Sequence, residues 1–498
     1  PLIYRATPQW FISMQKNDLR IKAIKAINDT VFYPNKGKER LLSMVEGRPD
    51  WCVSRQRVWG VPLPIFINKK TKEPLRDQKV IDKIASIYEK QGSDCWFTDD
   101  PKIFLGDDYN SKDYEKLNDI VEVWFDSGST HSFVLEKRKD LKWPADMYLE
   151  GSDQHRGWFH SSLLESCGTR GKAPFKSILS HGFVVDGKGM KMSKSTGNVI
   201  SPEDILKNYG ADILRVWASS SDYAEDLRID KNILIQHAES YRKIRNTFRF
   251  MLGNLKDKFE KQNFDKIKFN EFDELEQYIL NRLYMISRAV DDNLKNYNFH
   301  KLYKELLNFC ALDLSSFYFD IRKDVLYCDS LNSKKRKNCV IVLNIILESL
   351  LKWFAPILVF TTEEIYSLIN NENESIHENN FVKIPISWKN DKLNEKWSNL
   401  FKIKQETNVA IEEKRISKEI GSSLEAEIQL TINKEKFELL KDIDLAEYFI
   451  VSKAETKLSK VDEIKIKVNK AKGNKCERCW KILEIKCERC SNLAESKL

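Results

Sequence analysis

Two lysines and two serines lie close together in the segment Lys191-Met192-Ser193-Lys194-Ser195. Glycines at positions 187, 189 and 197 flank this segment and allow its backbone to flex. Ammonium and hydroxyl groups at this spacing suit the stabilisation of a transferring polyphosphate. The alternative for so short a segment is a solvated surface turn, and the surrounding sequence decides between the two.

A second segment with chemical potential, Glu150-Gly151-Ser152-Asp153-Gln154, lies about forty residues upstream. The apolar run 147–149 precedes it, and a helical pattern from Trp158 to Cys167 follows. We therefore expect a strand, a turn and a helix N-terminus. This order exposes carboxylates and backbone N–H groups at the carboxyl edge of a parallel sheet, where ligands bind.

The cysteines give an independent signal near the C-terminus. Cys476, Cys479, Cys487 and Cys490 form the pattern C-x2-C-x7-C-x2-C. Two such pairs can enclose one zinc ion in a closed four-thiolate site, which is structural rather than catalytic. Disulfide pairing is the alternative, and the doubled C-x2-C disfavours it. The remaining six cysteines are predicted to be reduced, small apolar residues: Cys52, Cys95, Cys167, Cys310, Cys328 and Cys339.

Length and charge set broad limits on the protein. A chain of 498 residues predicts about three or more domains. The net charge of +8 has the sign expected for contact with a phosphate backbone, although a generic soluble protein can carry it too. No window holds an uninterrupted apolar span and no signal segment opens the chain, which predicts a soluble, cytoplasmic protein. Since the chain begins with Pro1 rather than methionine, we expect it to be a piece of a longer protein.

Together these segments resemble the class I aminoacyl-tRNA synthetases, and most closely the bacterial-type members that attach isoleucine. Further matching segments occur in order along the chain: Trp51–Pro62, Val123–Gly128 and Tyr209–Arg215. The resemblance implies ATP with Mg²⁺, L-isoleucine and isoleucine tRNA as substrates, one structural Zn²⁺, and a monomer. A second signature of the family, His-Ile-Gly-His, is absent from the surroundings of all seven histidines. We therefore expect half of the active site to be missing and the chain to be inactive alone.

The resemblance also implies a multidomain α/β plus α fold, with the second half of a Rossmann-like parallel sheet. Largely apolar runs predict its strands at 121–125, 147–149 and 178–185, with a crossover helix at 158–167, and the residue pattern also predicts a strand within 51–67 and a helix at 24–31. Ser201 followed by Pro202 predicts a helix N-terminus, and the pattern predicts long amphipathic helices from about 232 to 371. The implied domains are the exit of the editing insertion (1–50), the second half of the catalytic domain (51–200) with a connective insertion (about 68–119), a stem-contact element (201–231), a helical anticodon-binding domain (232–395), an α+β C-terminal junction (396–470) and a zinc-binding domain (471–498).

Individual roles follow from the resemblance. Lys194 first, and Lys191 second, are expected to bind the departing phosphates of ATP, with Ser193 and Ser195 beside them. The residues expected to hold the aminoacyl-adenylate are Glu150, Gly151, Asp153 and Gln154. Trp158 and Trp124 are expected to wall the apolar side-chain pocket, although core packing explains Trp124 almost as well. The basic residues expected near tRNA phosphates, or offsetting thiolate charge, are Lys472, Lys475, Arg478, Lys481, Lys486 and Arg489.

Two alternatives remain open at this point. A valine-specific synthetase shares the lysine segment, although the runs Trp124–Gly128 and Ser221–Ile229 and the cysteine pairs favour isoleucine. A non-catalytic, zinc-containing RNA-binding protein derived from a synthetase would keep the helical part and lose the active-site residues. The intact Lys191–Ser195 segment argues against it.

Overall fold

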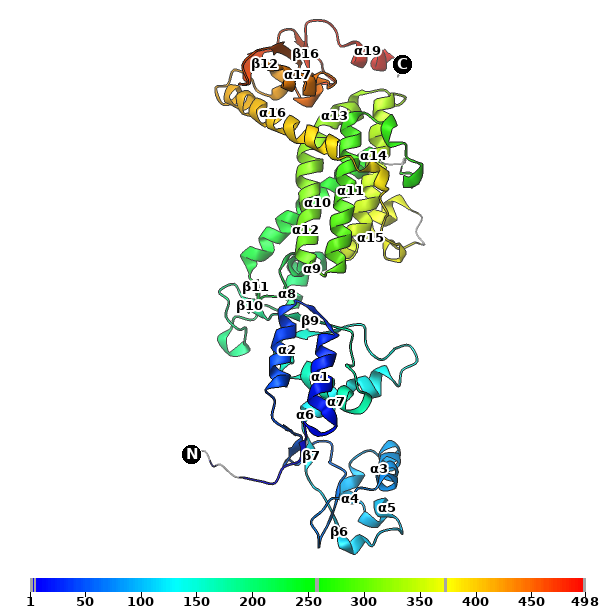
Figure 1. Cartoon of the computed structure of the whole chain (residues 1–498). Coiled ribbons are helices and arrows are strands. Elements are labelled where there is room, and N and C mark those ends of the chain that lie inside the picture. Colours follow the sequence, from blue (N-terminus) through cyan, green and yellow to red (C-terminus); the bar gives the residue numbers. More distant parts are fainter. Residues whose placement is uncertain (1–2, 4–5, 256–258, 371–373, 496–498) are drawn as a thin grey trace. The chain divides into compact units, whose positions relative to one another are not determined.

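The computed structural model of this protein describes residue 3 and residues 6–255, 259–370 and 374–495 (Figure 1). The contacts within the chain divide it into two units. The first runs to Val184 and includes Tyr223–Leu227, and the second comprises Val185–Asp222 and Arg228–Leu498. No helix in the described part of the chain has the length and apolar character that crossing a membrane requires.

A three-stranded parallel sheet in the order β2-β9-β8 lies at the centre of the first unit. Phe32 of β2 and Tyr148 of β8 both pair with Ile178 of β9. Helix α7 is buried along most of its length, as the crossover helix between two parallel strands must be. The predicted strand at 147–149 and helix at 158–167 are confirmed. The elements are α1 (Leu19–Asn28), β2 (Val31–Tyr33), α2 (Lys36–Glu46), β8 (Tyr148–Gly151), α7 (Trp158–Arg170) and β9 (Ser177–His181).

The predicted strand at 121–125 is wrong. Only β7 (Ile120–Val121) is extended, and it pairs antiparallel with β4 (Ser54–Arg55). The chain then turns into α6 (Val123–Gly128), where the Phe125 N–H donates to the Glu122 carbonyl at 2.9 Å. The segment 121–125 is apolar except for Glu122, and so short a segment does not distinguish a strand from a helix by its pattern. Asp126, Ser127 and Gly128, which are unsuited to a strand, are the last three residues of α6.

Three further predictions needed adjustment at their boundaries. The segment 178–185 does not continue as one strand after β9. At Gly182 the backbone passes so close to Glu225 that a Cβ there would lie 2.2 Å from the Glu225 carbonyl oxygen. The segment 51–67 contains only the short strands β3 (Trp51–Cys52), β4 and β5 (Phe66–Asn68). Prolines 62 and 64 interrupt it. Helix α1 begins and ends earlier than predicted, since Val31 pairs with Ser177 in the sheet.

The residues between β5 and β6 fold around a small core of their own. Trp96 is fully buried, with its ring centroid 4.9 Å from that of Phe66 and 5.2 Å from that of Phe104. Strand β5 pairs antiparallel with β6, so this excursion leaves and rejoins the first unit through adjacent strands. Its other elements are β6 (Tyr114–Lys116), α3 (Gln78–Gln91), α4 (Cys95–Thr98) and α5 (Pro101–Leu105). The 3-10 helix η2 (Ser111–Asp113) precedes β6.

Long helices make up most of the second unit, which confirms the helical character predicted for residues 232–371 in the described part of that range. Ser201 accepts from the Glu203 N–H at 3.2 Å and caps α8, whose first residue is Pro202, as the sequence predicts. The elements are β10 (Val184–Asp186), α8 (Pro202–Tyr209), α9 (Ala211–Ser220), β11 (Leu227–Ile229), α10 (Lys231–Leu255), α11 (Glu274–Lys295), α12 (Phe299–Asn308), α13 (Phe319–Cys328), α14 (Lys334–Phe354), α15 (Val359–Ile369) and α16 (Asp391–Ile416).

Two charged residues of the Tyr209–Arg215 motif attach α9 to the helical bundle. The buried Asp212 carboxylate accepts from the Thr361 N–H at 2.8 Å and from its hydroxyl at 2.6 Å, at the first turn of α15. Arg215 donates to the carbonyls of Ile357 and Pro356. A carboxylate at a helix N-terminus and a guanidinium on peptide carbonyls satisfy polar groups that would otherwise be unpaired. These two motif residues therefore have a structural role.

The C-terminal α+β part continues from α16. Strand β12 (Ala426–Ile432) alternates buried and half-buried residues along its length. It pairs in parallel with β13 (Lys453–Leu458) and antiparallel with β14 (Lys465–Lys470). Helices α17 (Lys434–Leu440) and α18 (Leu445–Tyr448) connect β12 to β13. The inward residues of β12 join the core of the helical bundle, so bundle and sheet share one hydrophobic core.

A buried ion-pair network links this part to the bundle. Arg322 of α13 is 3% exposed and holds Glu276 of α11 through two hydrogen bonds of 2.7 Å. It also donates to Glu447 of α18 at 2.7 Å, and Lys335 donates to the other oxygen of Glu447. Burial opposes the charge of Arg322, yet the facing Glu276 carboxylate raises the pKa of Arg322 well above its usual value. The network is charged and geometrically specific.

We predict that Glu276→Gln destabilises the bundle by about 3–5 kcal/mol, because it leaves a buried guanidinium without its main counter-charge. Urea unfolding followed by helical circular dichroism measures the loss. Glu271 provides the control, since its ion pair with Lys268 is exposed and Glu271→Gln should change stability by less than about 1 kcal/mol. Equal effects of the two substitutions would contradict the conclusion that Glu276 is the main counter-charge of the buried Arg322.

Glu165 of α7 gives a second stability prediction. Its Oε1 atom is buried without a partner among the described residues. Burial, with the negative charges of Asp126 and Glu122 adding to it, raises the pKa of Glu165 to about 9. The carboxyl group is therefore protonated in the folded chain at neutral pH, whereas it ionises near pH 4 when unfolded. Because folding suppresses this ionisation, the free energy of unfolding of the wild-type chain falls as pH rises between about 4 and 9.

Glu165→Gln should remove this dependence and raise the melting temperature at pH 8 more than at pH 5, as measured by thermal denaturation across a pH series. Glu136→Gln serves as a control of opposite sign. The hydrogen bond from Arg170 lowers the pKa of Glu136, so that substitution should reduce stability above its unfolded pKa and matter less in acid. Parallel pH profiles for the wild type and Glu165→Gln would show that Glu165 ionises freely.

Candidate active site and metal centre

The carboxyl end of β8 carries the predicted adenylate-binding residues. After Gly151 the chain turns through the 3-10 helix η4 (Ser152–His155) and enters α7. The Gly151 N–H donates to the Glu150 carboxylate at 2.9 Å, and the Asp153 carboxylate accepts from the Gln154 amide at 2.9 Å. Glu150 and Asp153 are both exposed. Two carboxylates and an amide thus lie together at the edge of the parallel sheet, where acceptors for ligand hydroxyl or ammonium groups are available.

The two predicted pocket tryptophans lie close to this turn. Trp158 stacks on Tyr148 with ring centroids 4.1 Å apart and an interplanar angle of 2°, and its indole N–H donates to the Ser127 carbonyl of α6. A Cβ at Gly157 would lie 2.5 Å from the Gln154 Oε1 atom and 2.9 Å from the Trp124 ring. Gly157 is therefore required for Trp124 and Gln154 to approach α7. Trp124 is 44% exposed, so it does not serve mainly as a core residue, and it stands on a helix rather than on the predicted strand.

The segment Lys191–Ser195, which we call the lysine loop, belongs to the second unit. Ser193 accepts from the Thr196 N–H and caps the 3-10 helix η5 (Lys194–Thr196). Ser195 lies with its hydroxyl 3.0 Å from that of Ser193. Lys191 and Lys194 are exposed, and neither ammonium group has a hydrogen-bond or ion-pair partner in the described part of the chain. Both cations remain available to an external anion.

Two residues outside the lysine loop hold its backbone in place. Asn198 accepts from the Ser193 N–H at 3.0 Å and donates to the Lys191 carbonyl and to the Asp186 carboxylate. The Asn198 side chain and the Met190 N–H hold the pKa of Asp186 below its usual value, so this acceptor stays ionised. The sequence analysis assigned no role to either residue. The one sequence feature that could have pointed to them is that Asp186 and Asn198 each lie beside a glycine.

The four C-terminal cysteines converge on one point. Their sulfur atoms all lie within 4.8 Å of one another, and the Cys479 and Cys487 sulfurs are 3.9 Å apart. A tetrahedral four-thiolate zinc site requires a separation of about 3.8 Å, given Zn–S bonds of about 2.3 Å. All four thiols are free of disulfides, which removes the disulfide alternative. Burial opposes ionisation of Cys476, but the N–H groups of Cys479 and Arg478 lower the pKa of Cys476 to about 7. The cluster therefore suits a metal ion.

The residues that present these thiols, 474–491, are here called the metal module. Strands β15 (Asn474–Lys475) and β16 (Ile482–Leu483) pair around the first cysteine pair, and α19 (Glu488–Glu495) carries Cys490. The module contacts α13. Arg489 donates to Asp324 at 2.7 and 3.0 Å and to Asp329 at 3.2 Å, and Arg478 donates to the Tyr327 carbonyl at 3.1 Å. Arg489 therefore pairs with carboxylates of the bundle.

The sequence analysis grouped Cys328 with the scattered cysteines rather than with the metal cluster. Cys328, the last residue of α13, packs against Cys479 and Cys490, and its thiol donates to the Arg478 carbonyl at 3.6 Å. It is free and buried, as predicted for the scattered cysteines. Its large distance from the cluster in the sequence gave no signal of this contact.

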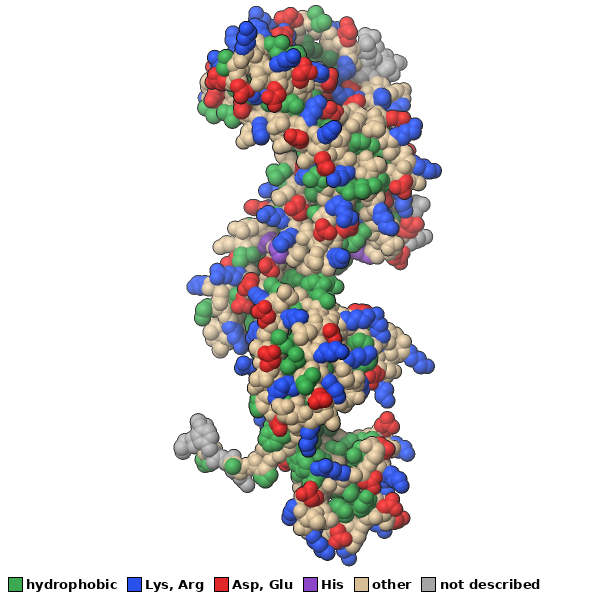
Figure 2. All heavy atoms as spheres, viewed as in Figure 1, with side chains coloured by type: hydrophobic (Ala, Val, Ile, Leu, Met, Phe, Trp, Pro, Cys, Tyr) green, Lys and Arg blue, Asp and Glu red, His purple; other side chains and the backbone are tan. Residues whose placement is uncertain are grey.

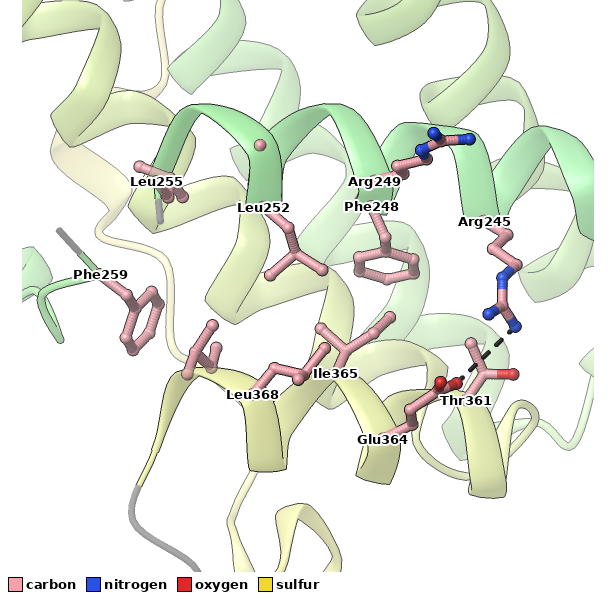
Figure 3. A pocket seen from close by; sticks show the side chains of 12 residues that line it. Arg245, Phe248, Arg249, Leu252, Leu255, Phe259, Thr361, Glu364, Ile365 and Leu368 are labelled. Atoms are coloured by element: carbon pink, nitrogen blue, oxygen red, sulfur yellow. Dashed lines mark ion pairs between the residues drawn. The ribbon is translucent and has the colours of Figure 1, made fainter. Parts of the chain in front are cut away.

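A large cavity in the described part of the chain lies elsewhere, in the bundle. It has a volume of about 670 Å³ and opens between α10 and α15. Figure 3 shows Phe248 and Leu252 facing Ile365 and Leu368 across it. At one end Arg245 forms an ion pair of 3.7 Å with Glu364. No residue predicted to carry chemistry lines this apolar cavity.

Charge on the surface offers little guidance by itself. Figure 2 shows Lys and Arg side chains interspersed with Asp and Glu over the visible face. The positive net charge of the chain therefore forms no single extended field on that face. Any recognition of an anion on that face would therefore depend on local groups of charges.

Two family models match the chain. The model described as "tRNA synthetases class I (I, L, M and V)" matches residues 2–230, and the model "Anticodon-binding domain of tRNA ligase" matches residues 276–430. The first match contains both the Glu150–Gln154 turn and the lysine loop. The second contains α13.

Curated relatives agree with these models. The chain is 66% identical over 492 residues to the isoleucine–tRNA ligase of Pelagibacter ubique, covering 99% of this chain and 54% of that protein. It is 45% identical to the enzyme of that name from Gluconobacter oxydans, covering 97% of this chain and 50% of that protein. The corresponding protein of Caldicellulosiruptor saccharolyticus is 46% identical, with 97% and 53% covered. The chain spans about half the length of these relatives.

Solved structures show the same fold at low sequence identity. A leucyl-tRNA synthetase from Agrobacterium radiobacter, determined in a ternary complex with tRNA, aligns with a TM-score of 0.51 at 16% identity, covering 80% of this chain and 48% of that one. A methionyl-tRNA synthetase from Mycobacterium tuberculosis aligns with a TM-score of 0.51 at 15% identity, covering 72% and 63%. Together the two family models, the curated relatives and the parallel-sheet-plus-bundle fold establish that this chain belongs to the class I tRNA synthetases.

Proposed function

We propose that this chain is part of an enzyme that attaches isoleucine to its tRNA through an isoleucyl-adenylate intermediate. The observation that carries the proposal is the lysine loop. Its two exposed ammonium groups have no partner among the described residues, and Asn198, bonded to Asp186, holds its backbone. The names of the curated relatives support isoleucine as the amino acid. Because those relatives are about twice as long, the activity is proposed for a protein of their length.

In the proposed reaction the carboxylate of isoleucine attacks the α-phosphorus of ATP, and pyrophosphate leaves. The terminal ribose hydroxyl of the tRNA then attacks the mixed anhydride and releases AMP. Such transfers need positioning and charge stabilisation more than covalent help from the protein. Lys194, with Lys191 and the hydroxyls of Ser193 and Ser195, would stabilise the charge that develops on the leaving phosphates of the ATP–Mg²⁺ complex.

The turn after β8 would hold the adenylate. Glu150 and Asp153 offer carboxylate oxygens to the ribose hydroxyls or to the ammonium group of the amino acid, and Gly151 allows close approach of the backbone. Gln154 lies between these carboxylates and the tryptophans. Trp124 and Trp158 would form the apolar wall against the isoleucine side chain.

We predict that Lys194→Ala, in a chain of the relatives' full length, lowers the rate of isoleucine activation by about 10²–10³-fold. This corresponds to about 2–4 kcal/mol of lost transition-state stabilisation. Isoleucine-dependent exchange of pyrophosphate into ATP measures the step. Lys188→Ala is the matched control, because Lys188 is an exposed lysine just outside the lysine loop. Unchanged exchange in Lys194→Ala would remove this lysine from the mechanism, and exchange supported by valine rather than isoleucine would favour the valine-specific alternative.

We also propose that the four-cysteine cluster binds one structural Zn²⁺ that fixes the metal module on α13. The four-sulfur donor set and the 3.9 Å sulfur separation support zinc over metals that prefer oxygen ligands. Cys476, Cys479, Cys487 and Cys490 would hold the ion as thiolates, and the ion would link the two cysteine pairs while their thiols release protons. Arg489 and Arg478 then hold the folded module against the bundle.

The purified chain under reducing conditions should contain about one zinc per molecule, measured by elemental analysis. Cys479→Ser should lose most of that metal, whereas Cys52→Ser, on the first unit, should retain it. In the full-length protein, Cys479→Ser should leave adenylate formation intact and reduce tRNA charging. Less than one zinc per chain in the wild type would reject the site, and equal loss of both activities would reject its proposed role in tRNA binding.

A further inference from the structure

Helix α6 supports both tryptophans of the proposed isoleucine pocket. It carries Trp124, and its Ser127 carbonyl accepts from the Trp158 indole N–H at 3.1 Å. The helix has only six residues, whereas an isolated helix shorter than about 12–15 residues is marginal in water. Contacts with the rest of the first unit therefore have to fix where α6 lies.

Glu122, the residue immediately before α6, makes the strongest of these contacts. It is 9% exposed and stands at the N-cap position, yet its side chain makes no capping hydrogen bond to the helix. Instead its Oε1 atom accepts from the Trp51 indole N–H at 2.6 Å, and its Oε2 atom accepts from the Arg55 guanidinium at 2.7 Å. Both carboxylate oxygens are thus bonded to the segment that contains β3 and β4.

The main chain of Glu122 reinforces this connection. Its N–H donates to the Val53 carbonyl at 2.9 Å. Its carbonyl accepts from the Phe125 N–H at 2.9 Å and from the Asp126 N–H at 3.3 Å, which forms the first turn of α6. The Trp51 ring also lies against that of Phe125, with centroids 5.7 Å apart. One residue therefore joins the β3–β4 segment to α6 through both its backbone and its side chain.

The surroundings of Glu122 are unfavourable to a carboxylate. Burial raises the pKa of Asp126, and the negative charge of Glu122 adds to that effect. The Glu122 charge also contributes to the raised pKa of Glu165, after burial and the charge of Asp126. A neutral acceptor would satisfy the Trp51 N–H, and the Arg55 side chain is 37% exposed, so its ion pair adds little stability. A carboxylate kept beside other acidic groups indicates a role beyond stability.

We propose that Glu122 is a positioning residue for isoleucine selection. By holding α6 against the β3–β4 segment, it sets the separation between Trp124 and the turn after β8, and so the shape of the apolar pocket. The fit there is close, because a Cβ at Gly157 would lie 2.9 Å from the Trp124 ring. Binding groups have to be held to within about 0.5 Å to select one ligand. The inference rests on the proposed function, since it takes Trp124 and Trp158 as walls of the isoleucine pocket.

The test uses a protein of the relatives' full length and isoleucine-dependent pyrophosphate exchange. Glu122→Gln keeps the side-chain shape, but its amide nitrogen cannot accept a hydrogen bond, so either Trp51 or Arg55 loses its acceptor. The KM for isoleucine should rise on the order of ten-fold and the kcat/KM ratio of isoleucine to valine should fall, with the KM for ATP within about two-fold of the wild type. Asp119→Asn is the matched control, because the Asp119 carboxylate accepts from the exposed Gln56 amide, and it should leave both KM values unchanged.

A second variant and a second measurement address the link itself. Trp51→Phe removes the indole N–H and keeps a ring against Phe125, so it should raise the KM for isoleucine in the same direction by a smaller factor. The double variant should be no worse than Glu122→Gln alone, because both substitutions break one link. In the purified chain, Glu122→Gln should speed amide hydrogen exchange in α6 and leave exchange in α7 unchanged, as measured by mass spectrometry.

The outcomes separate positioning from stability. A lower melting temperature and a lower kcat, with the KM values for isoleucine and ATP both unchanged, would assign Glu122 a purely structural role and overturn the inference. If Trp124→Ala raises the KM for isoleucine but Glu122→Gln and Trp51→Phe do not, the inference fails while the proposed function stands. If the wild-type protein of full length does not catalyse isoleucine-dependent exchange, both fail.

Discussion

The buried position of Arg322 is the constraint on which most of the second unit depends. A guanidinium that is 3% exposed requires counter-charges within hydrogen-bond distance, and these come from Glu276 on α11 and Glu447 on α18. One side chain thereby fixes three elements that are distant in the sequence. Because α13 is held in this way, its C-terminal turn presents Asp324, Tyr327 and Cys328 in a defined arrangement. The metal module contacts that turn.

The metal module shows how similar sequences acquire different roles. Both cysteine pairs have the sequence Cys-Glu-Arg-Cys, so Arg478 and Arg489 occupy equivalent positions. Arg489 lies against two carboxylates of the bundle and neutralises them. Among the described residues the Arg478 side chain donates only to a peptide carbonyl, and it is exposed. The difference comes from the surface that each pair faces, since charge pairing depends on the partner brought near it rather than on the motif.

In the first unit, close contacts at glycines fix the positions of neighbouring segments. Gly157 admits the Gln154 amide and the Trp124 ring to the start of α7, and Gly182 allows the chain to cross near Glu225. The parallel sheet directs the turn after β8 to one edge, where Glu150 and Asp153 are exposed. In the second unit the lysine loop follows the same design. Asn198 and Asp186 bond to each other and to backbone groups, and in the described part of the chain both ammonium groups stay unpaired. In both units, fixed backbone supports exposed polar side chains.

The sequence by itself determined the features that short-range chemistry encodes. The crossover helix at 158–167, the cap at Ser201, the long helices of 232–371 and the four-cysteine pattern follow from local periodicity, capping and ligand spacing. Local patterns did not determine the structure of 121–125. So short and largely apolar a segment fits either a strand or a helix, and its tertiary contacts decide between the two. Only the tertiary structure placed Cys328 beside the metal cluster, assigned Arg489 to carboxylates and brought Tyr327 and Trp480 to one cavity. These are contacts between residues far apart in the chain, and their energies depend on burial and on partners that only folding provides.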